Sequence, residues 1–106
     1  MRQGKVFYDG LFAGVITEDE NGFEFSYDEI YLKDENSKPI SLILPLRKEP
    51  YKSKIIFPFF DGLIPEGWLL DIAEKNWKIN QRDRMGLLLT FCKDCIGAVS
   101  VEQAEK

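Results

Sequence analysis

The sequence predicts a small α+β domain, in which an antiparallel sheet of four or five strands has two helices packed on one side. Short segments of alternating apolar and polar residues, typical of strands, lie in the first part of the chain. Asp9-Gly10 and Asn21-Gly22 separate them, and such dipeptides favour tight β-hairpin turns. Two later segments carry apolar residues at helical spacing, which predicts helices that cover the sheet.

The N-terminal part is expected to form an antiparallel meander. Residues 5–8 are the first predicted strand and residues 11–17 the second, with Gly14 marking a bulge or a close approach of two backbones. Residues 23–27 alternate between apolar and polar types, which predicts a half-buried third strand. The residues expected to share its buried face are Phe23, Phe25 and Tyr27.

Less regular structure is expected in the middle of the chain. Asp28 can cap a short helical turn. Residues 40–44 are apolar and are expected to form a fourth strand. Residues 46–49 lie between two prolines and are predicted to be irregular, and residues 52–54 are predicted to be a mobile loop. A closing strand is expected at residues 98–101.

Two helices are expected in the second half of the chain. The first covers residues 65–77, because proline is favoured at a first helical position, where Pro65 stands, and Glu66 complements the positive end of the helix dipole. The second covers about 81–93, with Asn80 as its cap. The apolar stripe of the second helix is Met85, Leu88, Leu89 and Cys92.

Composition argues against catalysis by this chain alone. Its 106 residues form one expected domain, 1–106, with a polar tail at 101–106. There is no histidine, the commonest general base and metal ligand, and the net charge of −4 disfavours direct contact with nucleic acid. No apolar run is long enough to span a membrane, and two cysteines without an export signal favour the cytoplasm. We therefore expect a cytoplasmic binding module without metal or cofactor.

Two groups of residues could still suggest chemistry. Cys92 and Cys95 form a Cys-x-x-Cys motif, but at a helix C-terminus the dipole raises a thiol pKa, and a zinc site would need two more ligands. Core cysteines are expected, with a redox pair or an intermolecular metal site as alternatives. The carboxylates of Asp61, Glu66 and Asp71 are interpreted as caps and surface charges, because no nucleophile or oxyanion-binding group accompanies them.

Residues 55–68 hold more large apolar side chains than a domain of this size easily buries. Trp68 falls at the edge of the expected helix stripe, beside Gly67, and tryptophan is a typical interface anchor. A partner is therefore expected to contact Trp68, whereas the other interpretation is that its ring packs on Phe57 or Phe59. The expected partner-binding residues are Ile64, Pro65, Glu66, Gly67, Trp68 and Asp71.

Four segments, at residues 6–14, 40–47, 59–67 and 93–99, carry a family resemblance. The most specific reads Phe-Phe-Asp-Gly-Leu-Ile-Pro-Glu-Gly at 59–67. In this order and spacing the segments resemble the N-terminal subdomain of the HipA-type serine/threonine kinase toxins of bacteria, whose kinase core does not follow here. The chain looks like the short protein, HipS, of split three-gene systems that also contain a kinase, HipT, and a DNA-binding protein, HipB.

The resemblance implies an antitoxin that binds a HipT-type kinase toxin and suppresses it, in a ternary complex with a HipB-type protein. Trp68 would dock at or near the kinase active site, and Glu66 and Asp71 would either meet basic residues of its cleft or stay solvated. One rival interpretation is a structural N-terminal lobe excised from a full-length HipA-type kinase. A second is a stand-alone redox protein that uses Cys92 and Cys95.

Overall fold

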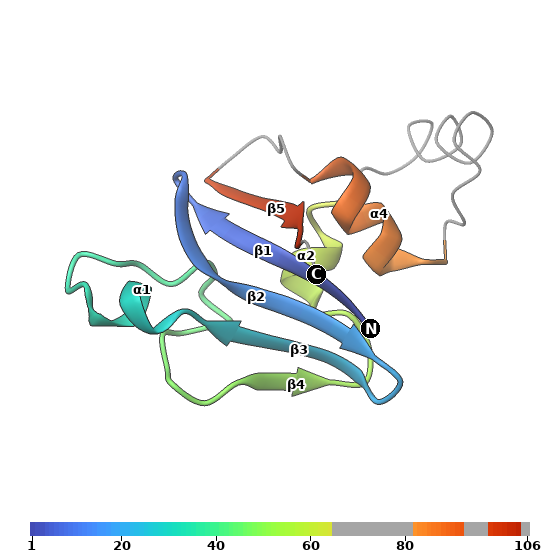
Figure 1. Cartoon of the computed structure of the whole chain (residues 1–106), viewed down its shortest axis with the longest axis horizontal. Coiled ribbons are helices and arrows are strands. Elements are labelled where there is room, and N and C mark those ends of the chain that lie inside the picture. Colours follow the sequence, from blue (N-terminus) through green and yellow to red (C-terminus); the bar gives the residue numbers. More distant parts are fainter. Residues whose placement is uncertain (65–81, 93–97, 105–106) are drawn as a thin grey trace.

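A computed structural model describes residues 1–64, 82–92 and 98–104 and contains a five-stranded antiparallel sheet of order β4-β3-β2-β1-β5. The strands are β1 (Arg2–Tyr8), β2 (Leu11–Asp19), β3 (Gly22–Tyr27), β4 (Tyr51–Ser53) and β5 (Val99–Gln103). The described helices are α1 (Glu29–Lys33), α2 (Pro58–Asp61) and α4 (Arg84–Phe91). In Figure 1, α2 and α4 cover one side of the sheet near β1 and β5, and α1 lies at the far end. The predicted α+β class is confirmed.

Both predicted hairpins are present. Asp9 and Gly10 have positive φ angles of 49° and 80°, the backbone that a tight turn between β1 and β2 requires. The turn between β2 and β3 uses Gly22, with φ of 131°, and the Asp19 carboxylate accepts a hydrogen bond of 2.8 Å from the backbone N–H of Asn21. The Asp19 side chain thus serves the turn locally.

Gly14 lies at the predicted irregularity of β2. Val6 faces Gly14 across the β1–β2 ladder whereas Phe7 faces Phe12, so Ala13 is an extra residue on β2. This bulge changes the twist of the strand and lets the carbonyl of Ala13 accept a hydrogen bond of 2.8 Å from the N–H at the start of the α1 turn. The chain thereby leaves β3 and enters α1 at a defined angle.

The predicted fourth strand at 40–44 is wrong. Ser41 and Leu44 form a single bridge within a tight turn, and the fourth strand is Tyr51–Ser53, in the region expected to be mobile. Residue 40 follows one proline and residue 44 precedes another, so this short apolar run cannot extend into a ladder strand. The later segment can pair because its backbone runs antiparallel beside residues 23–25 of β3.

The helix expected at 81–93 is shorter than predicted. It begins at Arg84, because the side chain of Asp83 caps it by accepting a hydrogen bond of 3.2 Å from the N–H of Gly86. Asn80, the expected cap, lies outside the described residues. Of the four expected stripe residues, Met85, Leu88 and Cys92 are fully buried, whereas Leu89 is only partly buried. Leu87, which the predicted stripe did not include, is fully buried.

Among the helices in the described ranges, α2 was not predicted from sequence patterns. Pro58 occupies its first turn, as proline prefers, and the helix ends at Gly62 after a single turn. The predicted helix at 65–77 lies outside the described residues. At the C-terminus, β5 runs through Gln103 and buries Val101 completely, so the expected polar tail begins later than residue 101.

Candidate functional site

The predicted partner-binding segment meets the described structure only at Ile64. Its side chain is 3% exposed and belongs to the core, so in this arrangement it offers no contact surface. Pro65, Glu66, Gly67, Trp68 and Asp71 lie outside the described residues. Much of the apolar stretch that precedes them is core: Phe57 and Phe60 are buried, whereas Ile55 remains 71% exposed.

The chain on either side of residues 65–81 is held by contacts between α2 and α4. Arg84 Nε donates a hydrogen bond of 2.6 Å to Asp61 Oδ1, and the two side chains form an ion pair. The Sγ of Cys92 donates to the carbonyl oxygen of Leu63 at 3.3 Å. Asp61 and Cys92 therefore have structural roles, as the sequence interpretation expected. These contacts hold together the described residues that precede and follow the predicted docking segment in the sequence.

A second polar cluster joins the sheet to the start of α4. The guanidinium of Arg2 donates to Asp83 through both terminal nitrogens, at 2.8 and 2.7 Å for Nη1 and Nη2 respectively, and Arg2 Nε donates to Glu18 Oε1 at 2.8 Å. The hydrogen bonds from Arg2 lower the pKa of Asp83. Because the side chains of Arg2 and Asp83 are more than a third exposed, water screens the pair and its contribution to stability is modest.

The described residues offer little for catalysis. Across 1–64, 82–92 and 98–104, no three or more acidic or cysteine side chains gather where they could hold a metal ion. Cys92 is buried, and Cys95 lies outside those ranges, so the redox alternative has no described pair of thiols to act. None of the helices in the described ranges has the length and apolar character to cross a bilayer.

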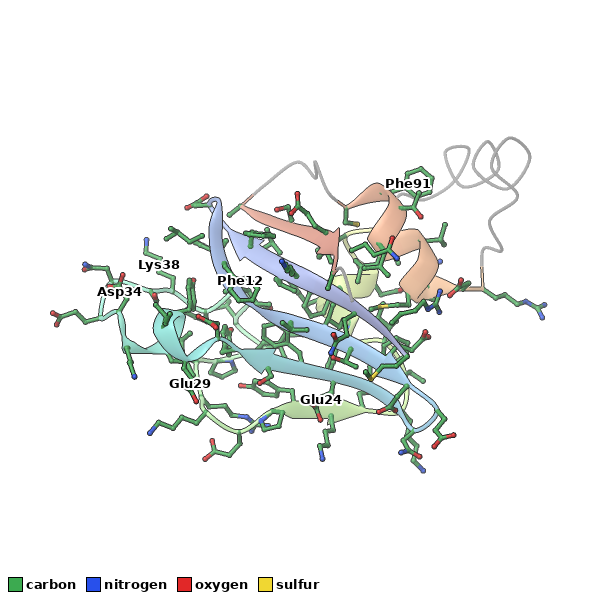
Figure 2. The ribbon with its side chains drawn as sticks, viewed as in Figure 1. Phe12, Glu24, Glu29, Asp34, Lys38 and Phe91 are labelled. Atoms are coloured by element: carbon green, nitrogen blue, oxygen red, sulfur yellow. The ribbon has the colours of Figure 1, made fainter. Side chains whose placement is uncertain are left out.

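One exposed apolar surface lies on the outer face of the sheet. The rings of Phe7 and Phe12 pack at a centroid distance of 5.8 Å, and Phe12 is 37% exposed. Figure 2 shows Phe12 over the strands on the side away from α2. Charged cross-strand neighbours flank this pair, including Lys5 opposite Glu102. Antiparallel sheets commonly leave one face to water, so this surface alone does not define a site.

A more unusual exposed surface is the turn between α1 and β4. We call Leu42 and Ile43 the apolar tip: their side chains are 96% and 57% exposed. The nearest apolar residue on each side of the tip is buried, since Ile40 is 5% exposed and Leu44 is 3% exposed. The turn therefore buries two of its large apolar side chains and exposes the other two to solvent.

Two tyrosines hold the base of this turn. The Tyr27 hydroxyl accepts a hydrogen bond of 3.1 Å from the N–H of Ile40 and donates one to the carbonyl oxygen of Leu44. The Tyr31 hydroxyl donates to the carbonyl oxygen of Lys38 at 2.5 Å. The two rings stack, with planes 4° apart and centroids 6.1 Å apart. Buried tyrosine side chains of β3 and α1 thus hold the loop in a defined conformation by hydrogen bonds to its backbone.

Burial raises the pKa of Tyr27 to about 12, compared with about 10 in an unfolded chain. The fold favours the neutral phenol. Its contribution to the free energy of unfolding is therefore complete below pH 10 and is lost as the pH rises from 10 to 12. At pH 11 the loss is about 1.4 kcal/mol. We expect the stability difference between the wild type and Tyr27→Phe, measured by urea unfolding, to shrink by this amount between pH 8 and pH 11. A constant difference would contradict the burial of this hydroxyl.

Comparison with known proteins identifies the domain. A family model described as HipA N-terminal domain matches residues 4–102. The chain belongs to the HipA N-terminal domain family. A solved structure described as "N-terminal domain of HipA toxin" superposes with a TM-score of 0.77 and 37% sequence identity, and the match covers 100% of this chain and 95% of that one. The resemblance read from the sequence is confirmed at the level of this domain.

Two relatives of this HipA N-terminal domain differ greatly in length. An uncharacterized protein of Haemophilus influenzae is 36% identical over 106 residues, with 100% of this chain and 96% of that protein covered. A putative kinase of Sinorhizobium fredii, Y4mE, is 45% identical over 97 residues, which are 91% of this chain and only 23% of the kinase. The domain therefore occurs both in a protein of its own length and as the smaller part of a much longer one.

In this HipA N-terminal domain, sequence reasoning missed the apolar tip because residues 40–44 were interpreted as a strand. In a strand, successive side chains alternate between core and solvent, so the strand interpretation gave no reason to expect two adjacent exposed apolar residues. Prolines at positions 39 and 45 were the available signal, because they predict a short, bounded turn rather than a ladder strand. Leu42 and Ile43 are then the residues at the top of that turn.

Proposed function

We propose that this HipA N-terminal domain acts as an antitoxin that binds a HipT- or HipA-type serine/threonine kinase and suppresses its activity. The observation that carries the proposal is that the same domain forms 23% of a putative kinase yet makes up 96% of a relative of its own length. A domain fused to a kinase makes contacts within one chain, and the separate domain can make equivalent contacts between two chains. In our proposal a HipB-type DNA-binding protein joins the complex.

The chemistry of the described residues fits a regulator better than an enzyme. The chain has no histidine, and the acidic residues nearest the predicted docking segment are engaged in structure, as Asp61 is with Arg84. Regulation by binding requires shape and apolar anchors rather than reactive groups. The proposed mechanism is occlusion of the kinase active site by the segment that follows Ile64, with Trp68 as its anchor.

Co-expression tests the proposal directly. The chain is expressed together with a HipT- or HipA-type kinase, and growth and co-purification are measured together. We expect growth to recover and the two proteins to elute as one complex, whereas the kinase alone stops growth. Recovery without a complex, or a complex without recovery, would contradict inhibition by docking.

Replacing Trp68 by alanine is expected to weaken inhibition of the kinase at least tenfold, because truncating an interface anchor removes more than about 1.4 kcal/mol of binding free energy. The measurement is the concentration of domain that halves kinase activity. Trp77→Ala is the matched control, since it removes the other tryptophan of the chain. If both variants inhibit as the wild type does, Trp68 is not the anchor and the assignment is wrong.

The second candidate function is a structural lobe of a longer kinase, and the 45% identity to part of the Sinorhizobium fredii protein favours it. Reading the gene beyond the codon of residue 106 separates the two candidates. An immediate stop codon followed by a separate kinase reading frame supports the antitoxin, and an uninterrupted frame into a kinase core supports the lobe.

A further inference from the structure

The apolar tip, Leu42 and Ile43, lies in an uncharged stretch of a chain that is otherwise rich in charge. Charged residues make up 30% of the sequence, yet none occurs between Lys38 and Arg47. The most exposed side chain of this stretch, that of Leu42, is 96% accessible. Moving the exposed Leu42 side chain from water into an apolar pocket is favourable, and no residue next to it in sequence carries a charge that would have to be desolvated.

The turn that carries the tip is rigid at its base. Its closing hydrogen bond joins the N–H of Leu44 to the carbonyl oxygen of Ser41 at 3.1 Å, and the hydroxyl of Ser41 accepts from the N–H of Ile43 at 3.3 Å. Outside the turn, Tyr27 holds both Ile40 and Leu44. A surface that is already ordered loses little conformational entropy on binding, which is the property of a preformed docking element.

We propose that the apolar tip is a second docking element, which inserts into an apolar pocket on the kinase module of a HipA-type kinase. This inference rests on the proposed function. The kinase module is the committed occupant because this domain accounts for only 23% of a kinase relative, so in that protein more than three quarters of the chain is present to cover its exposed apolar residues. The absence of charge from residue 39 to residue 46 fits an apolar pocket and not an acidic or basic surface.

The tip and the described helices on either side of residues 65–81 lie in different parts of the domain. Figure 1 shows α1 and the loop after it at one end of the sheet, and α4, which precedes the closing strand, at the other. The segment of residues 65–81 connects α2 to α4. In this proposal two contacts from separate parts of one domain act as a bivalent ligand, in which the tip holds the domain on the kinase and the other element inhibits it.

The test separates binding from inhibition. Leu42→Asp is compared with Ile30→Asp, whose side chain on α1 is also exposed, at 79%, but lies outside the tethered turn. The measurements are the dissociation constant for the purified kinase and the residual kinase activity at saturating domain. We expect Leu42→Asp to weaken binding about ten- to a hundredfold, the loss for one fully buried leucine, and still to inhibit completely at saturation. Ile30→Asp is expected to change binding less than threefold.

Each outcome has a definite meaning. Wild-type affinity in Leu42→Asp overturns the docking tip but leaves the antitoxin proposal intact, because the domain still binds. Equal weakening by both variants overturns the tip as well, because the effect then follows charge and not position. A wild-type domain that does not bind the kinase overturns both proposals. Self-association that Leu42→Asp abolishes, with kinase binding unchanged, would assign the tip to a second copy of the chain and overturn the kinase pocket.

Urea unfolding of the purified Leu42→Asp variant tests whether weaker binding could result from loss of the fold. A side chain that is 96% exposed contributes almost nothing to the core, so Leu42→Asp should unfold at the same urea midpoint as the wild type. Tyr27→Phe supplies an independent variant, since it keeps the tip residues and removes the hydroxyl that holds the turn. Weaker binding by Tyr27→Phe supports the preformed turn, and unchanged binding by both Tyr27→Phe and Leu42→Asp overturns it.

Discussion

Replacing Phe60 by alanine should remove a large part of the protein's free energy of unfolding. Its ring is completely buried, and its centroid lies 5.5 Å from that of Phe25, 6.2 Å from that of Phe57 and 5.3 Å from that of Phe59. Phenylalanine-to-alanine changes in a core cost about 3–5 kcal/mol. A domain of this size has roughly 5–15 kcal/mol in total, so the change removes much of its stability.

The measurement is the free energy of unfolding in urea, followed by circular dichroism. Phe12→Ala is the matched control, because that ring lies on the outer face of the sheet and is 37% exposed. We expect the control to lose about 1 kcal/mol or less. Equal midpoints for the two variants would show that α2 is not part of the core. Because α2 immediately precedes the predicted docking segment, Phe60→Ala should also abolish inhibition of the kinase.

Local sequence signals predicted the meander of β1, β2 and β3 well. Asp9-Gly10 requires positive φ angles that only a tight turn uses, and the alternation from Phe23 to Tyr27 matches the pleat of a half-buried strand. The cap at Asp28 was also predicted, and its carboxylate accepts hydrogen bonds from the first turn of α1. These features depend on a few adjacent residues, which is why the sequence alone was sufficient.

The predictions that failed depend on contacts between distant residues. Residues 40–44 were read as a strand, but the hydroxyl of Tyr27, which is far away in sequence, takes the backbone groups that a neighbouring strand would have paired. Residues 51–53 form the real edge strand only because β3 offers them a partner. The helix α2 is a single turn, too short for any periodic signal. The same error explains why the exposed tip of the candidate site was not predicted. A strand was expected where the chain forms a turn.

Gly14→Ala is expected to cost roughly 3 kcal/mol, at the upper end of the range for overpacking. A Cβ at this position would lie 2.3 Å from the carbonyl oxygen of Ser26 and 3.0 Å from the Cα of Tyr27. Both obstacles are backbone atoms of β3 that pair directly with β2, since Tyr27 faces Gly14 and Ser26 faces Val15. Here β3 cannot move away from one methyl group without breaking that ladder. The β2–β3 register must therefore distort, and that distortion also displaces the tyrosine that holds the apolar tip.

Gly62→Ala is the control that makes this result specific. Gly62 ends α2 with a φ of −67°, and a Cβ there would meet its nearest atom at 3.4 Å, an ordinary contact. Since alanine restricts the unfolded chain more than glycine does, this variant should gain about 0.4–1 kcal/mol. The two glycine-to-alanine changes are thus expected to move the urea midpoint in opposite directions. If Gly14→Ala were as stable as Gly62→Ala, the bulge could not bring the β2 and β3 backbones so close. The position of Tyr27, and with it the tip, would then not depend on close contact between β2 and β3.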